Sequence, residues 1–142
     1  MTQGSVLNLA QLEWAEGIYK DSKYPIGGDP RHWLDTSGRR KVFEIQGKSK
    51  RTEALMVVEG LDEGLGEVLF FAVSPESWGT GSSARCWQFF QQSLPYAELW
   101  LEVHSENLPA KRFYELQGFE ITGKRQGYYR DGGDALQLVK KI

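Results

Sequence analysis

The chain has one cysteine, no long apolar run and almost no excess charge. Because Cys86 has no second cysteine to pair with, no internal disulfide can form, and we expect a cytoplasmic setting. No run of roughly 18 apolar residues is present, so we expect no membrane-spanning helix. The first six residues lack the basic segment and apolar core of a secretory signal. With a formal net charge of −2, the chain has no general attraction for nucleic acid or an anionic membrane, and we expect neither as a partner.

The 142 residues contain no internal repeat, low-complexity tract or linker, so we expect one domain spanning residues 1–142. Apolar periodicity predicts helices over residues 9–19, 29–34, 81–94 and 107–117. Valine-, leucine- and phenylalanine-rich runs predict strands over residues 41–46, 53–59, 67–73, 97–103, 119–124 and 135–139. Short glycine-bearing turns between the first three strands favour an antiparallel meander. This order is typical of a mixed α/β (α+β) fold with helices packed on a sheet.

Two side chains of complementary chemistry are predicted on neighbouring rigid elements. Glu102 lies inside strand 97–103, where it alternates with Leu101 and Val103 and therefore faces away from them. Tyr114 lies on helix 107–117, which Asn107 caps and Gly118 ends. A general base and a general acid held in this way are typical of an acyl-transfer enzyme. The alternatives are a solvated strand position for Glu102 and a core tyrosine for Tyr114.

A glycine-rich segment, Trp78-Gly-Thr-Gly-Ser-Ser83, links strand 67–73 to helix 81–94. Backbone N–H groups at a helix N-terminus attract phosphate, and Gly79 and Gly81 allow close approach because they lack a Cβ. Ser82 and Ser83 add hydroxyl donors. The segment has neither the Gly-Lys-Ser/Thr of a Walker loop nor a third glycine of a dinucleotide site, which leaves coenzyme A. A tight turn without a ligand is the alternative. The backbone N–H near Val73 is the predicted oxyanion donor.

Several C-terminal motifs together resemble one family: Leu99-Trp-Leu-Glu-Val103, Ser105, Asn107, Phe113-Tyr-Glu-Leu-Gln-Gly-Phe119, Gly127-Tyr-Tyr129 and Asp134-Ala-Leu136. Over nearly its whole length the chain resembles the Gcn5-related N-acetyltransferases (GNAT), and among them the RimI-type acetyltransferases of protein N-terminal alanine. The resemblance implies a mixed, mostly antiparallel sheet of six to seven strands with helices on both faces. It also implies that the fourth and fifth strands, 67–73 and 97–103, splay apart to admit acetyl-CoA.

The resemblance implies roles for individual residues. Glu102 would be the general base, Tyr114 the general acid and Asn107 a cofactor contact, while residues 78–83, including Thr80, would hold the pyrophosphate. Glu67 is a rival base, by resemblance to the histone acetyltransferase branch. Trp78 would cover the loop or stack near the cofactor.

Two features depart from the family pattern. Glu76 stands where the family usually has Gln or Arg, and the segment from Val73 to Gly79 is about two residues short. A carboxylate beside a pyrophosphate is repulsive unless it points away.

The neighbouring polar and aromatic residues leave alternatives open. His104 would relay protons or simply be a polar surface residue. Tyr128 and Tyr129 would line the acceptor groove or pack.

The predicted activity is direct acetyl transfer from acetyl-CoA to a primary amine, without a metal or a covalent enzyme intermediate, because Cys86 has no base beside it. A protein N-terminus is the predicted acceptor, by analogy with the RimI type, and a small-amine metabolite is the alternative. A GNAT-like acyl-CoA- or peptide-binding module with weak or no catalysis is a rival of another class. The expected assembly is a monomer or homodimer.

Overall fold

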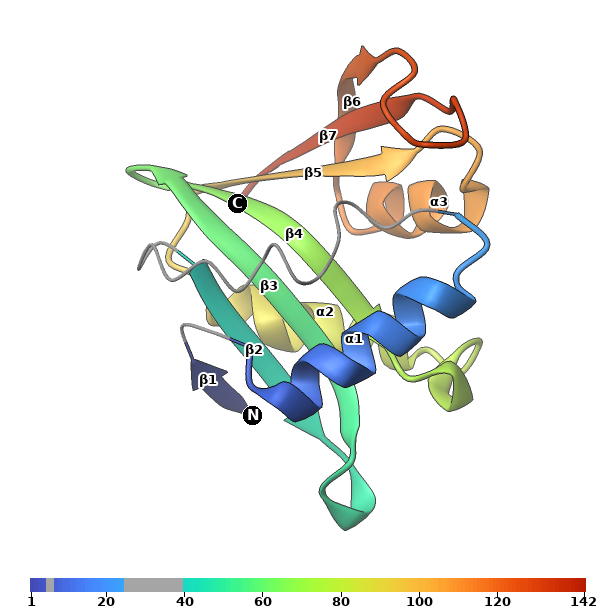
Figure 1. The fold of residues 1–142 in the computed structure, drawn as a ribbon. Coiled ribbons are helices and arrows are strands. Elements are labelled where there is room, and N and C mark those ends of the chain that lie inside the picture. The colour runs from blue at the N-terminus through green and yellow to red at the C-terminus, as the bar shows by residue number, and fades with distance from the viewer. Residues whose placement is uncertain (5–6, 25–39) are drawn as a thin grey trace.

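A computed structural model describes residues 1–4, 7–24 and 40–142. Three α-helices and seven β-strands lie in these ranges (Figure 1). In chain order they are β1 (Thr2–Gly4), α1 (Leu9–Asp21), β2 (Arg40–Gln46), β3 (Thr52–Asp62), β4 (Leu65–Val73), α2 (Ser82–Gln92), β5 (Glu98–His104), α3 (Leu108–Leu116), β6 (Glu120–Arg125) and β7 (Ala135–Lys141). Two 3-10 turns, η2 (Lys48–Lys50) and η3 (Pro75–Ser77), follow β2 and β4.

The helices begin and end where the sequence provides capping residues. Asn8 and Gln11 form a reciprocal capping box at the start of α1. The Asn107 side chain accepts from the Ala110 N–H at 3.3 Å and so caps α3, as predicted. Gly118 follows α3 with a φ of +98°, the left-handed conformation that closes a helix.

All seven strands form one sheet in the order β1-β2-β3-β4-β5-β7-β6. Every neighbouring pair is antiparallel except β4 and β5. The predicted meander of β2, β3 and β4 is confirmed, and so is the mixed α/β fold. The strand β3 continues to Asp62, beyond the predicted end at residue 59, because a tight turn at Gly64 (φ +76°) joins it directly to β4. The strand β1 was not predicted from the sequence, and the predicted helix 29–34 lies outside the described residues.

Helices cover both faces of the sheet (Figure 1). On one face, α1 packs through Ala15 and Leu12 onto Leu55, Val57 and Phe70. On the other, α2 and α3 bury Trp87, Phe90 and Tyr114 in the larger core. None of the described helices is long and apolar enough to cross a membrane.

The parallel strands β4 and β5 pair over a short length and then separate. Only Leu65, Gly66 and Glu67 have register partners in β5, namely Glu98, Leu99 and Trp100. Beyond this point β4 stays paired with β3 and β5 with β7, and the two strands diverge (Figure 1). The predicted opening between these strands is therefore confirmed.

Candidate active site

A cleft of about 110 Å³ occupies the opening between the diverging strands. Strand β4 contributes one wall, β5 the other, and α3 closes the end. The lining residues are Val68, Leu69, Phe70, Phe71, Leu101, Glu102, Val103, His104, Asn107, Ala110 and Tyr114. The structure thus brings together the predicted base, acid and cofactor contact, Glu102, Tyr114 and Asn107, although they come from different elements.

A β-bulge in β4 lies in the wall of this cleft. Val57 and Val58 of β3 pair with Phe70 and Val68 of β4, which leaves Leu69 as an extra residue without a register partner. The extra residue of a bulge is withdrawn from the ladder of hydrogen bonds. By contrast, Val73 pairs with Ala54 and is not among the described residues that line the cleft. Leu69 is therefore the residue of β4 that combines a place in the cleft wall with the lack of a register partner in β3.

Glu102 lies at the cleft with its carboxylate mostly buried. Among the described residues it pairs with one cation, Arg125 of β6, whose Nε lies 3.4 Å from Glu102 Oε2. That oxygen has no solvent exposure, and the contact with Arg125 meets the distance for an ion pair but not the geometry of a hydrogen bond. Burial raises the pKa of the Glu102 carboxyl above its ordinary value, and the Arg125 charge partly offsets this. A carboxylate with a raised pKa is a better proton acceptor at neutral pH.

Glu67, the rival base, is the third residue of β4, on the last register pair before the strands separate. Its pKa is also raised, first by burial and then by the charges of Glu102 and Glu59. The two candidate bases are thus close enough to interact electrostatically. The positive charge of Arg125 lowers the pKa of both carboxyl groups and so partly offsets the effect of burial on each.

Tyr114 points from α3 into the same cleft. Its ring packs edge-on against Trp87, Phe113 and Phe119, with centroids 5.2–5.6 Å apart. Burial raises the pKa of the phenol well above its ordinary value of about 10. The hydroxyl therefore keeps its proton at neutral pH, as a general acid must.

The glycine-rich loop leaves a row of backbone N–H groups without partners. Gly79 and Gly81 have φ of +76° and +82°, and Gly81 is the residue before the first turn of α2. Among the described residues, no acceptor contacts the amides of Gly79, Gly81, Ser83 or Ala84. A Cβ on Gly79 would meet nothing within 4 Å, so the loop is open above it. Open amides at a helix N-terminus fit a phosphate group.

The side chains of the loop mostly stabilise its own shape. Trp78, 58% exposed, donates from its indole Nε1 to the carbonyl of Val73 at 3.1 Å. The Thr80 hydroxyl contacts Ser77 and Ser82 within the loop. The Arg85 guanidinium donates to the Ser82 hydroxyl at 3.0 Å, which places a positive charge beside the open amides. The sequence analysis did not identify Arg85, although its position three residues after Ser82 on a helix could have indicated it.

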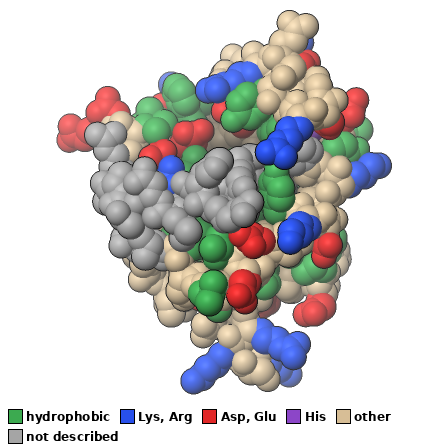
Figure 2. All heavy atoms as spheres, viewed as in Figure 1, with side chains coloured by type: hydrophobic (Ala, Val, Ile, Leu, Met, Phe, Trp, Pro, Cys, Tyr) green, Lys and Arg blue, Asp and Glu red, His purple; other side chains and the backbone are tan. Residues whose placement is uncertain are grey.

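Glu76 lines a different hollow from the open amides. It lies in η3 and borders a pocket of about 580 Å³, together with Lys48 and Arg51 of the turn between β2 and β3. Lys and Arg side chains gather at this end of the molecule (Figure 2, bottom). The carboxylate that departs from the family pattern thus has its own basic surroundings at the β2–β3 turn.

His104 was considered as a surface residue, and this interpretation is wrong. It is 1% exposed, at the end of β5 on the same face as Glu102. Its ring lies against Tyr129, which is buried as well, whereas Tyr128 is half exposed and contacts Arg125. The ring of Tyr129 is therefore packed against His104.

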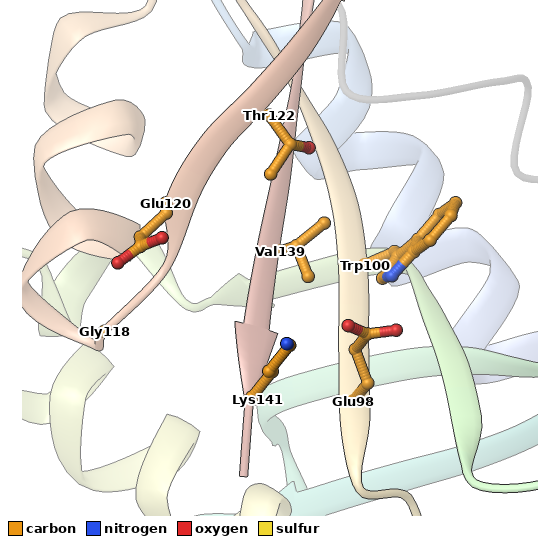
Figure 3. Close-up of a pocket in the computed structure, with 7 residues that line it drawn as sticks. All are labelled: Glu98, Trp100, Gly118, Glu120, Thr122, Val139 and Lys141. Carbon is orange, nitrogen blue, oxygen red and sulfur yellow. The ribbon is translucent and has the colours of Figure 1, made fainter.

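A second hollow of about 650 Å³ lies on the sheet beyond Glu102. Figure 3 shows its lining side chains on three adjacent strands: Glu98 and Trp100 from β5, Val139 and Lys141 from β7, and Glu120 and Thr122 from β6. Glu98, Trp100 and Glu102 alternate along β5 and share a face, so this hollow borders residues on the same face of β5 as the predicted base. It was not predicted, because it depends on the order in which the last three strands pair.

Comparisons with known proteins agree with this geometry. The family model of the acetyltransferase (GNAT) family matches residues 12–119. An uncharacterized N-acetyltransferase of Methanocaldococcus jannaschii is 30% identical over 91 residues, which are 60% of this chain and 57% of that protein's length.

Two solved structures share the fold. One is the ribosomal-protein-S18-alanine N-acetyltransferase of Escherichia coli, with a TM-score of 0.78 and 24% identity over 99% of this chain and 93% of that one. The other is a GNAT family acetyltransferase of Elizabethkingia anophelis with acetyl-CoA bound, with a TM-score of 0.67 and 14% identity over 74% and 78%.

Proposed function

Because the chain belongs to the acetyltransferase (GNAT) family, we propose that it acetylates the α-amine at the N-terminus of a protein, with acetyl-CoA as donor. The observation that carries the proposal is the cleft between β4 and β5. It joins a buried carboxylate, an unpaired strand residue and a protonated phenol in one place. The likeness to the S18-alanine acetyltransferase supports a protein N-terminus as the acceptor.

The proposed donor site runs from the loop into the cleft. The open amides of Gly79, Gly81 and Ser83 would hold the pyrophosphate, with Arg85 adding a positive charge. Asn107 and Ala110 line the path toward the reacting carbon. The structure with acetyl-CoA bound shows that this fold accepts the donor.

The proposed reaction needs three groups of this chain. Glu102 accepts the proton of the incoming ammonium, directly or through water, and its raised pKa suits this task. The Leu69 N–H stabilises the negative charge on the attacked carbonyl oxygen. Tyr114 then gives its proton to the departing thiolate. Cys86 takes no part, because it is buried in α2 and burial raises the pKa of its thiol.

The face that carries Glu102 would receive the acceptor. The carboxylates of Glu67 and Glu98 lie on this side of β4 and β5, close to the exposed ring of Trp100. Negative charge concentrates an ammonium group near the cleft, and an aromatic face binds it further. A protein N-terminus brings such a group, and so does a small amine, which remains the alternative acceptor. A cytoplasmic location stays a prediction.

The test is an acceptor screen read by release of free thiol from acetyl-CoA. Hexapeptides with each of the common N-terminal residues are compared with a set of small primary amines. We expect turnover of peptides and loss of that turnover when the α-amine is blocked beforehand. Turnover of small amines alone would contradict the proposed acceptor. If calorimetry detects no heat of binding at millimolar acetyl-CoA, the result would favour a module that binds a peptide without catalysing acetyl transfer.

A further inference from the structure

His104 has both ring nitrogens engaged although it is almost fully buried. Its Nδ1 accepts the backbone N–H of Glu106 at 3.1 Å. Its Nε2 lies 2.7 Å from Oδ2 of Asp131, in the loop between β6 and β7. Because a nitrogen that accepts an N–H carries no proton, the neutral ring holds its proton on Nε2 and donates it to Asp131. The ring is therefore fixed in one orientation and one tautomer.

The contact with Asp131 closes a tight structure in this loop. Asp131 Oδ1 accepts the Gly133 N–H at 2.8 Å, and the Tyr129 carbonyl accepts the Gly132 N–H at 2.9 Å. Tyr129 in turn stacks on the imidazole, with centroids 4.9 Å apart and planes 25° apart. Gly133 is pressed against the same ring, since a Cβ there would lie 2.1 Å from His104 Nε2. The loop thus rests on His104 at three points.

The same histidine also fixes the turn that leads to the cleft. The His104 carbonyl accepts the Asn107 N–H at 2.9 Å, next to the bond between its ring and Glu106. Asn107 caps α3, and α3 carries Tyr114 into the cleft. One imidazole therefore connects the loop after β6 to the helix that carries the predicted acid.

The loop brings one polar group that lacks a partner. The Tyr129 hydroxyl is buried and has no hydrogen-bond partner among the described residues, and it lies near enough to the Glu102 charge to interact with it. A buried hydroxyl without a partner is costly, so such a group is typical of a place where a ligand or water completes it.

We propose that His104 and Asp131 form a latch that positions the loop 126–134, with the Tyr129 hydroxyl, on the acceptor side of the cleft. His104 and Asp131 are positioning residues in this scheme, because they act on the acceptor through Tyr129 and the loop. The scheme rests on the proposed transfer to an amine acceptor.

The kinetic test uses Asp131→Ala, because Asp131 is half exposed and its loss leaves the core intact. With a hexapeptide that begins with alanine, we expect the acceptor KM to rise about tenfold, because small misplacements of binding groups are costly. The KM for acetyl-CoA should change less than about twofold, since the donor loop has no contact with the latch. Asp131→Asn, whose amide oxygen still accepts from His104, should restore most of the acceptor KM.

Two further variants separate the latch from a general loss of stability. Gly133→Ala presses on the imidazole and should also raise the acceptor KM. Asp62→Ala removes a carboxylate that likewise accepts a backbone N–H, at the β3–β4 turn, and should leave both KM values unchanged. An unchanged acceptor KM in Asp131→Ala, or an equal rise in both KM values, would overturn the latch.

A measurement without an acceptor keeps the two proposals apart. Nitrogen NMR of the imidazoles should show His104 with a bare Nδ1 and a protonated Nε2, with His32→Gln used to assign the signals. In Asp131→Ala, amide hydrogen exchange should quicken at residues 126–134 and stay unchanged in β5. Unchanged exchange in the loop would refute the latch, whatever the acceptor is. If amide hydrogen exchange at residues 126–134 quickens in Asp131→Ala but the parent protein turns over no peptide, the proposed acceptor class is wrong. The proposal that His104 and Asp131 hold the loop is then still supported.

Discussion

Replacing Gly79 by alanine tests whether the glycine-rich loop holds the donor's phosphates. Gly127, in the loop after β6, is a matched control, because both glycines have positive φ (+76° and +61°) and neither has an atom within 4 Å of an added Cβ. Alanine in a left-handed conformation costs roughly 1–2 kcal/mol at either position. Both variants should therefore melt roughly 2–8 °C below the parent.

Only the change at Gly79 should weaken donor binding. Its new methyl group would stand in the open space beside the glycine-rich loop, where we propose that a phosphate approaches. Losing one hydrogen bond to a charged group costs roughly 1.5–3 kcal/mol, or roughly 10- to 150-fold in Kd. The control at Gly127 should bind the donor as the parent does.

Calorimetry measures the Kd for coenzyme A and the Kd for acetyl-CoA in the parent and in both variants, and it needs no acceptor. Thermal melting of the same samples shows whether the two substitutions cause the same strain. If Gly79→Ala melts lower but keeps the parent's Kd, the amides of the loop do not hold the phosphates, and the donor site must be sought elsewhere.

Three further predictions concern the chemistry. Tyr114→Phe should lower kcat by about 10²- to 10⁴-fold with the acetyl-CoA Kd unchanged, and equal turnover would remove Tyr114 from the mechanism. In pH–rate profiles of kcat/KM, Glu102→Gln should abolish the acidic limb and Glu67→Gln should keep it; the reverse result would make Glu67 the base. Because Arg125 lowers the pKa of Glu102, Arg125→Gln should move that limb to higher pH. A partly exposed ion pair is worth roughly 0.2–1 kcal/mol, so the expected move is about 0.2–0.7 of a pH unit, and a move to lower pH would contradict this assignment.

The positions of most elements were predictable because their signals are local. Asn107 and Gly118 mark the ends of α3 through hydrogen bonds and a φ value that involve only nearby residues. Alternation along residues 98–104 gave the common face of Trp100 and Glu102 in the same way. The strand β1 was not predicted because its three exposed residues, Thr2, Gln3 and Gly4, show no alternation of apolar and polar side chains. They form a strand because they pair with the edge of β2.

The partners of the site residues could not be predicted, since they come from distant parts of the chain. Arg125 pairs with Glu102, and Asp131 with His104, across separate strands and loops. The bulge at Leu69 likewise depends on how β4 aligns with β3. A charged residue in a sequence shows what it can do, but its neighbours in space decide its pKa and orientation.

The sequence by itself determined which chemical groups this protein offers and on which type of element each one lies, because hydrophobic period, capping and turn preferences act over a few residues. Only the tertiary structure decided that β4 and β5 separate after three paired positions, and that a carboxylate, a phenol and a bulged strand residue meet in the space between them. The physical reason is that strand register and side-chain burial are set by the packing of the whole sheet between its helices, which no short stretch of sequence encodes.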